Sequence, residues 1–137
     1  MPYPIRICLD IIETKGIESE HIYKSHSINK SHLEQVCDYI NKDKIENKLD
    51  ELNAEPNLAC GIIKKFLKEL KSPLIPDEII TLLEKCDSNI PDKEYANKIE
   101  HLKRILGKMP QANYDTIAYL LIHFYRVLNK VKFIIKI

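Results

Sequence analysis

Apolar residues recur every three or four positions in one segment of this chain after another. That spacing predicts amphipathic helices, because it places the apolar side chains on one helix face. Only three glycines are present in 137 residues, so the turns that link β-strands are scarce. We therefore expect an all-α fold, a single domain of about six helices. Helices are predicted over residues 4–15, 29–40, 56–70, 77–86, 95–106 and from Pro110 onward.

Prolines and polar stretches mark the ends of these segments. Pro73, Pro76 and Pro91 interrupt the helical pattern, whereas Pro110 suits the start of the last long helix. Residues 41–55 are polar and are expected to form a surface connection anchored by Leu49 and Leu52. The final residues, VKFIIKI, extend the last helix or pair as a strand, and the pattern leaves both open. A buried stripe is expected along that helix at Ile117, Leu120, Leu121, Phe124, Val127 and Leu128.

Bulk properties exclude several classes of function. The net charge of +1 argues against a general nucleic-acid binder. Four widely spaced cysteines and five histidines form no zinc-ligand pattern, so no metal is expected. The sequence contains no glycine-rich phosphate-binding loop, so no nucleotide cofactor is expected. The longest apolar run, residues 117–122, is too short to cross a membrane. Without a signal-peptide pattern, we expect a cytoplasmic protein with reduced thiols.

Three blocks carry a family resemblance. They are GIESEHIYKSHS at residues 16–27, NLACGIIKKFLKELKSPLIP at residues 57–76, and LGKMPQANYDTIAYLLIHF at residues 106–124. In order and spacing they resemble the RhoGAP domain, the Rho GTPase-activating domain, over nearly the whole chain. We therefore interpret residues 1–137 as one RhoGAP-like domain, without the family's N-terminal helix and C-terminal block. The resemblance therefore predicts that the chain is part of a larger signalling protein, or a truncated form of one.

The resemblance implies both a partner and a mechanism. RhoGAP domains are all-helical and bind the switch regions of Rho, Rac or Cdc42. They insert an arginine finger beside the nucleotide phosphates, a contribution of about 10³ to 10⁵ in rate. By this resemblance Lys24 stands at the finger position, Lys64 at the family's lysine, and Lys68 where a second arginine is usual. Tyr23, Lys24, Lys64 and Lys68 form the expected GTPase-binding set.

The chain departs from the family pattern around this expected site. Lysine replaces arginine at Lys24 and Lys68, and lysine lacks the planar fork that contacts two oxygens at once. His21 and Ser27 replace glycines beside the finger, which reduces the backbone freedom of the loop. Lys71 replaces a proline. We therefore expect weak or absent GTPase-activating activity, while binding survives.

Simpler interpretations apply to the same residues. Lys24, Lys64 and Lys68 are ordinary solvated lysines if the resemblance is set aside. Ile22 and Tyr23 suit anchoring of the loop in the core. His123, on a mainly apolar helix, is expected to be a core or boundary histidine with a satisfied nitrogen. The residues to which we assign structural roles are Ile22, Pro73, Pro110 and Asn113.

Three functions remain open at this point. The first is a GTPase-activating domain with residual activity through Lys24. The second is a pseudo-GAP, a module that binds a GTPase without accelerating hydrolysis. The third is a protein-interaction domain that no longer binds GTPases. In none of the three is the chain an enzyme by itself.

Overall fold

A computed structural model describes the backbone of residues 1–16, 23 and 29–136, and the side chains of this set up to residue 129. The described residues form α-helices, short helical turns and the segments that connect them, with no strand. Seven α-helices occur in this part of the chain, which confirms the all-α expectation and adds one helix to it. The chain divides into two compact units, Met1–Glu69 with Leu120–Ile137, and Leu70–Tyr119.

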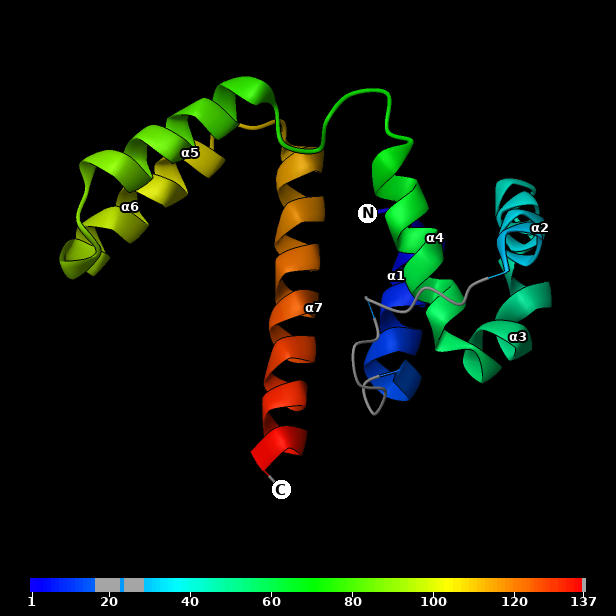
Figure 1. Ribbon diagram of the computed structural model, residues 1–137. Coiled ribbons are helices and arrows are strands. Elements are labelled where there is room, and N and C mark those ends of the chain that lie inside the picture. Colours follow the sequence, from blue (N-terminus) through cyan, green and yellow to red (C-terminus); the bar gives the residue numbers. More distant parts are fainter. Residues whose placement is uncertain (17–22, 24–28, 137) are drawn as a thin grey trace. The chain divides into compact units, whose positions relative to one another are not determined.

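The first unit is built on the pair α1 (Tyr3–Ile11) and α4 (Pro56–Lys68), which pack against each other (Figure 1). Both helices have a proline in their first turn, where its missing N–H costs nothing. Their apolar faces supply fully buried side chains, including Leu9 of α1 with Leu58 and Ile63 of α4. The predicted helix over 4–15 changes form at its end, because residues Ile12–Gly16 make a π-helical turn that Gly16 closes.

Helix α2 (Lys30–Asn41) begins where the sequence pattern places it. The side chain of Asn29 caps it, since Oδ1 accepts hydrogen bonds from the backbone N–H of Ser31 at 3.0 Å and of His32 at 3.3 Å. Val36 is the fully buried residue of this helix. The cap therefore fixes where helical structure resumes after the loop block.

Residues 41–55 contain more structure than the predicted surface connection. A 3₁₀ turn (Ile45–Lys48) leads directly into the short helix α3 (Leu49–Ala54). Ile45 and Leu52 are buried, and Leu52 has no exposed surface, so the expected anchor at Leu52 is present. The expected surface connection therefore contains a short helix, which the buried Leu52 anchors and the buried Ile45 precedes.

The second unit contains a helical hairpin. Helices α5 (Asp77–Asn89) and α6 (Tyr95–Leu106) lie side by side, joined by a turn that includes the 3₁₀ segment Asp92–Glu94 (Figure 1). Lys98 closes the turn, with its Nζ 2.7 Å from carboxylate oxygens of both Asp87 and Asp92. The core of this unit comprises Ile79, Met109 and Ile117, packed against Leu74, Ile75, Leu83, Ile105 and Leu106.

Helix α7 (Gln111–Lys136) contributes residues to both units. It runs through residues 131–136, so the final segment extends the helix and does not form a strand. The expected buried stripe is only partly correct. Ile117, Leu120 and Val127 are buried, whereas Phe124, Leu121 and Leu128 are 39%, 57% and 53% exposed. The buried stripe of α7 is thus narrower than the pattern predicts.

Candidate functional site

The candidate site is built around Tyr23, the one residue of the block 17–28 that the structure describes. Its backbone carbonyl accepts a hydrogen bond from the Nζ of Lys64. Lys64 lies on the exposed side of α4, one residue after the fully buried Ile63. The helix therefore presents the lysine towards the loop while its neighbours form the core. Two members of the expected GTPase-binding set, Tyr23 and Lys64, are thereby brought into direct contact.

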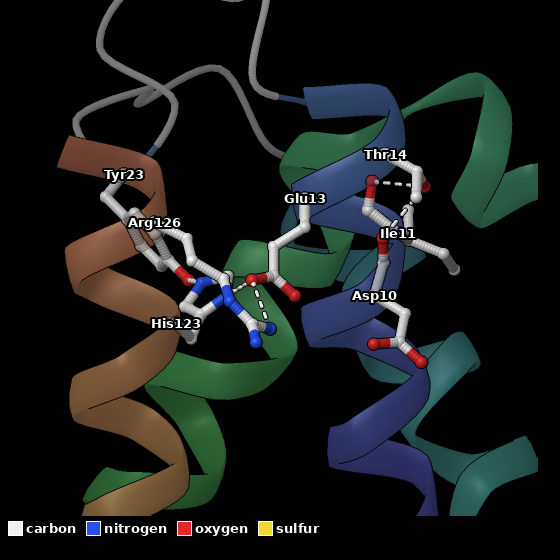
Figure 2. Close-up of polar contacts among 7 residues, drawn as sticks. All are labelled: Asp10, Ile11, Glu13, Thr14, Tyr23, His123 and Arg126. Atoms are coloured by element: carbon white, nitrogen blue, oxygen red, sulfur yellow. Dashed lines mark hydrogen bonds and ion pairs between the residues drawn. The ribbon is translucent and has the colours of Figure 1, made fainter. Parts of the chain in front are cut away.

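The side chain of Tyr23 is directed at α7. Its hydroxyl lies 2.5 Å from Nε2 of His123 (Figure 2). Its ring makes edge contacts with the rings of His123 and Phe124, at centroid distances of 5.9 and 5.5 Å. Burial raises the pKa of the Tyr23 phenol, with smaller contributions from Cys60 and Glu13 in the same direction. The phenol is therefore protonated, so its O–H can donate to Nε2.

His123 receives that bond in the interior of the first unit. The residue is 1% exposed, and burial lowers the pKa of its imidazole, so the ring is neutral at pH 7. When Nε2 accepts from the Tyr23 hydroxyl, the single ring proton is on Nδ1. The expectation of a buried histidine with a satisfied nitrogen is confirmed at Nε2.

A carboxylate lies on the other side of the same ring. Nδ1 of His123 is 3.8 Å from Oε1 of Glu13, which is beyond hydrogen-bonding distance but close enough for an electrostatic interaction (Figure 2). The same oxygen lies 3.3 Å from the guanidinium of Arg126, one helical turn after His123 on α7. The Glu13 side chain is only 15% exposed, whereas Arg126 is 63% exposed. A polar chain thus runs from solvent through Arg126, Glu13 and His123 to Tyr23.

Sequence reasoning missed Glu13 and Arg126. Arg126 follows His123 by three positions, so both lie on one face of α7, and that spacing was a usable signal. Nothing in the sequence linked Glu13 to them, since it is over a hundred residues away in the chain. Contacts of this kind depend on the tertiary fold.

Lys68 lies one turn after Lys64 on α4 and is also exposed. Between them, Lys65 pairs with Glu69, Nζ to Oε1 at 2.8 Å. Hydrogen bonding to Glu69 raises the pKa of Lys65, so this lysine is occupied by a local ion pair. Lys68 forms no ion pair with any residue that the structure describes. Lys68 therefore presents an exposed cation on this helix face, beside Lys64, whose Nζ is also exposed but hydrogen-bonded to the Tyr23 carbonyl.

Lys24 and Ile22 lie outside the described residues, as do the departures at His21 and Ser27. Their predicted roles stay predictions.

The other predicted structural residues belong to the second unit. Asn113, in the first turn of α7, donates from Nδ2 to the carbonyl of Leu74 at 2.9 Å. The carbonyl of Pro110 accepts from the N–H of Tyr114 at 3.0 Å, so Pro110 opens the helix. Pro73 lies in the segment between α4 and α5, next to the residue that Asn113 holds.

Other kinds of chemistry find little support in the part of the chain that the structure describes. It contains no group of three or more histidine, cysteine or acidic side chains placed to hold a metal ion. Burial raises the pKa of the Cys8 and Cys60 thiols to about 12, which makes them unreactive. Within the same residues, no helix has the length and apolar character needed to cross a bilayer.

Comparison with known proteins decides the family. The profile of the RhoGAP domain matches residues 2–133, across both compact units. The chain belongs to the RhoGAP family. The resemblance seen in the three sequence blocks is thereby confirmed over nearly the whole chain.

Individual RhoGAP relatives agree with this assignment. Rho GTPase-activating protein 35 of Rattus norvegicus is 35% identical over 129 residues, which cover 92% of this chain and 8% of the relative. Rho GTPase-activating protein 15 of Mus musculus is 25% identical, covering 95% of this chain and 26% of the relative. The chain thus spans a small part of these longer proteins.

The RhoGAP fold is also found among solved structures. The crystal structure of human Rho GTPase activating protein 15 matches with a TM-score of 0.84 at 23% identity. The match covers 96% of this chain and 60% of the other. At this identity the likeness concerns the fold, and it agrees with the all-helical architecture described above.

Proposed function

We propose that this RhoGAP domain binds a Rho-type small GTPase through the face of α4 that carries Lys64 and Lys68, together with the residues that follow Tyr23. The observation that carries the proposal is the hydrogen bond from Lys64 to the carbonyl of Tyr23. It joins the lysine that matches a family position to the residue directly before position 24. Membership of the RhoGAP family supports the class of partner.

The proposed binding face suits an acidic partner surface. Lys64 and Lys68 are exposed and lie on one side of the helix, since residues four apart share a face. Exposed charges of this kind speed the encounter of two proteins more than they tighten the final complex. We therefore assign Lys68, which has no ion pair with the described residues, a contact with the GTPase.

We further propose that activation of GTP hydrolysis is weak. Position 24 is the finger position by its sequence context, Ile-Tyr-Lys, and it carries lysine. A lysine ammonium supplies charge, but it cannot form the two parallel hydrogen bonds of a guanidinium. An arginine finger contributes about 10³ to 10⁵ in rate, and lysine retains only the part due to charge.

The test of activity is single-turnover GTP hydrolysis by Rho, Rac and Cdc42 with the domain in excess. We expect Lys24→Arg to raise the rate by at least about tenfold, and Lys24→Ala to remove what the wild type has. Lys42→Arg, the same exchange at an exposed position after α2, is the matched control and should change nothing. A wild-type rate equal to that of Lys24→Arg would contradict the proposed loss.

Binding is tested separately, by affinity for each GTPase loaded with GDP or with a non-hydrolysable GTP analogue. We expect Lys68→Glu to weaken binding by about tenfold, because the new carboxylate would be repelled by the acidic surface of the partner. Lys103→Glu, an exposed lysine of the second unit, is the control with the same charge change. Absence of binding to every member in both nucleotide states would leave the third function, a protein-interaction domain that does not bind GTPases.

A further inference from the structure

We propose that His123 and Glu13 are positioning residues, which fix Tyr23 and thereby the start of the segment that carries position 24. The inference deepens the proposed function, because it says how the fold prepares that position for a GTPase. It concerns residues that lie on three separate parts of the first unit: the turn after α1, the loop block and α7. None of them matches the finger, the lysine or the second arginine of the family pattern.

The first step is that Tyr23 is held at three points. Lys64 of α4 binds its carbonyl, His123 of α7 binds its hydroxyl, and Phe124 contacts its ring. A residue fixed through both backbone and side chain has little freedom left. The next Cα lies about 3.8 Å further along the chain, so the placement of Tyr23 sets where residue 24 begins.

The second step concerns the direction of the hydrogen bonds. The protonated phenol donates to Nε2, which requires the neutral imidazole with its proton on Nδ1. Nδ1–H then faces the Glu13 carboxylate at 3.8 Å, which favours this tautomer over the alternative. Arg126 in turn attracts the same carboxylate from the solvent side. Arg126 therefore orients Glu13, Glu13 orients the His123 ring, and that ring orients Tyr23.

The third step is that packing alone does not require this arrangement. A buried imidazole without hydrogen bonds is less stable than one whose nitrogens are bonded. An apolar residue would fill the same space beside Phe124 without that cost, but would leave the Tyr23 hydroxyl unpaired. Three charged groups act on the imidazole: Glu13 and Asp10 favour its protonated form, and Arg126 opposes it. Burial also opposes protonation and has the largest effect. The net result is a neutral acceptor aimed at Tyr23 (Figure 2).

The first experiment needs no GTPase. Trypsin cleaves after lysine, and mass spectrometry can follow cleavage after Lys24 against cleavage after Lys103 as the internal control. We expect Tyr23→Phe and His123→Leu to speed cleavage after Lys24 by about tenfold, since release of Tyr23 makes local opening easier. His123→Gln should stay near wild type, because its amide oxygen can accept the hydroxyl in place of Nε2. Unchanged cleavage after Lys24 in both disruptive variants would overturn the proposal.

The second experiment is spectroscopic. Nitrogen-15 shifts of the His123 ring should show a protonated Nδ1 and an unprotonated Nε2, and Tyr23→Phe should shift the Nε2 signal. The opposite tautomer in the wild type would overturn the proposal. If His123→Leu does not fold, Glu13→Gln tests the same series from its other end and should speed cleavage after Lys24 while the protein remains folded.

The third experiment places the network in the GTPase reaction, in the Lys24→Arg background. We expect Tyr23→Phe and His123→Leu to lower the saturating single-turnover rate by about 10- to 100-fold, with affinity changed by less than about threefold, because misplacement affects the transition state. Recovery by His123→Gln supports positioning, and equal losses in rate and affinity would overturn it. If Lys24→Arg binds no GTPase, the proposed function fails, while cleavage and ring shifts still decide on the network.

Discussion

Burial keeps the imidazole of His123 neutral, because a charged ring would lose its hydration in the interior of the first unit. The Glu13 carboxylate favours the charged form, but the desolvation effect is larger and the pKa is lowered overall. The hydrogen bond from Tyr23 depends on this result, since a protonated ring has no acceptor nitrogen. A proton on Nε2 therefore reverses the direction of this hydrogen bond, because the Tyr23 hydroxyl can also accept.

This gives a prediction for stability against pH. The unfolded chain has a histidine pKa near 6.5, and the folded pKa lies below it. As pH falls below 6.5, the unfolded state takes up a proton that the folded state does not, so the free energy of unfolding decreases. We expect the wild type to lose more stability than His123→Gln between pH 7.5 and 5.5, by urea unfolding. Parallel pH profiles for the two proteins would show that His123 does not titrate in this way.

Leu52 offers a second prediction at this scale. It has no exposed surface, and its burial explains why residues 49–54 form a helix at all. Leu52→Ala should lower the free energy of unfolding by about 2–5 kcal/mol, because it removes buried methylene groups and leaves a cavity. The measurement is chemical denaturation monitored by circular dichroism.

The matched control for Leu52 is Leu128→Ala. That leucine is also helical but 53% exposed, so the same truncation should change stability by less than about 0.5 kcal/mol. Equal losses at the two positions would mean that Leu52 is not a core residue.

At the scale of the elements, helical periodicity was a good guide wherever the apolar face was long. The predicted helix 56–70 and the observed α4 differ only by two residues at the C-terminal end. The agreement is close because Pro56 opens the helix and six consecutive residues, 58–63, are buried. The same reasoning did not find the helix within 41–55, where the large apolar residues are Ile45, Leu49 and Leu52 among mostly polar ones. Short helices such as α3 are stabilised by tertiary packing, which the local sequence pattern does not reveal.

The start of α7 provides the prediction that belongs to elements. Asn113 ties this helix to the segment before α5, through the carbonyl of Leu74. Asn113→Ala should cost about 1 kcal/mol or more, since it leaves a partly buried carbonyl without its donor. Thermal or urea unfolding measures the change. Asn97→Ala is the control, because its side chain makes only an exposed contact of 3.4 Å with Glu94, and it should be nearly neutral.

Across the whole molecule, the all-helical class and the family followed from spacing and from three blocks that span most of the chain. Lys64 and Tyr23 could be named from those blocks, although their direct hydrogen bond could not. The contacts among Glu13, Tyr23 and His123 join positions up to 110 residues apart, and no local pattern encodes such pairs. Sequence therefore located parts of the candidate site, and folding determined how they connect.

The thiols have a practical consequence for studying the protein. Cys8, Cys60 and Cys86 are buried, whereas Cys37, on α2, is partly open to solvent. A maleimide dye added to the native protein should consequently attach at Cys37 ahead of the others. Lys65 and Glu69 act electrostatically on Cys37, so this natural labelling position lies near the helix that carries Lys64 and Lys68. Fluorescence titrations can therefore begin on the unaltered chain.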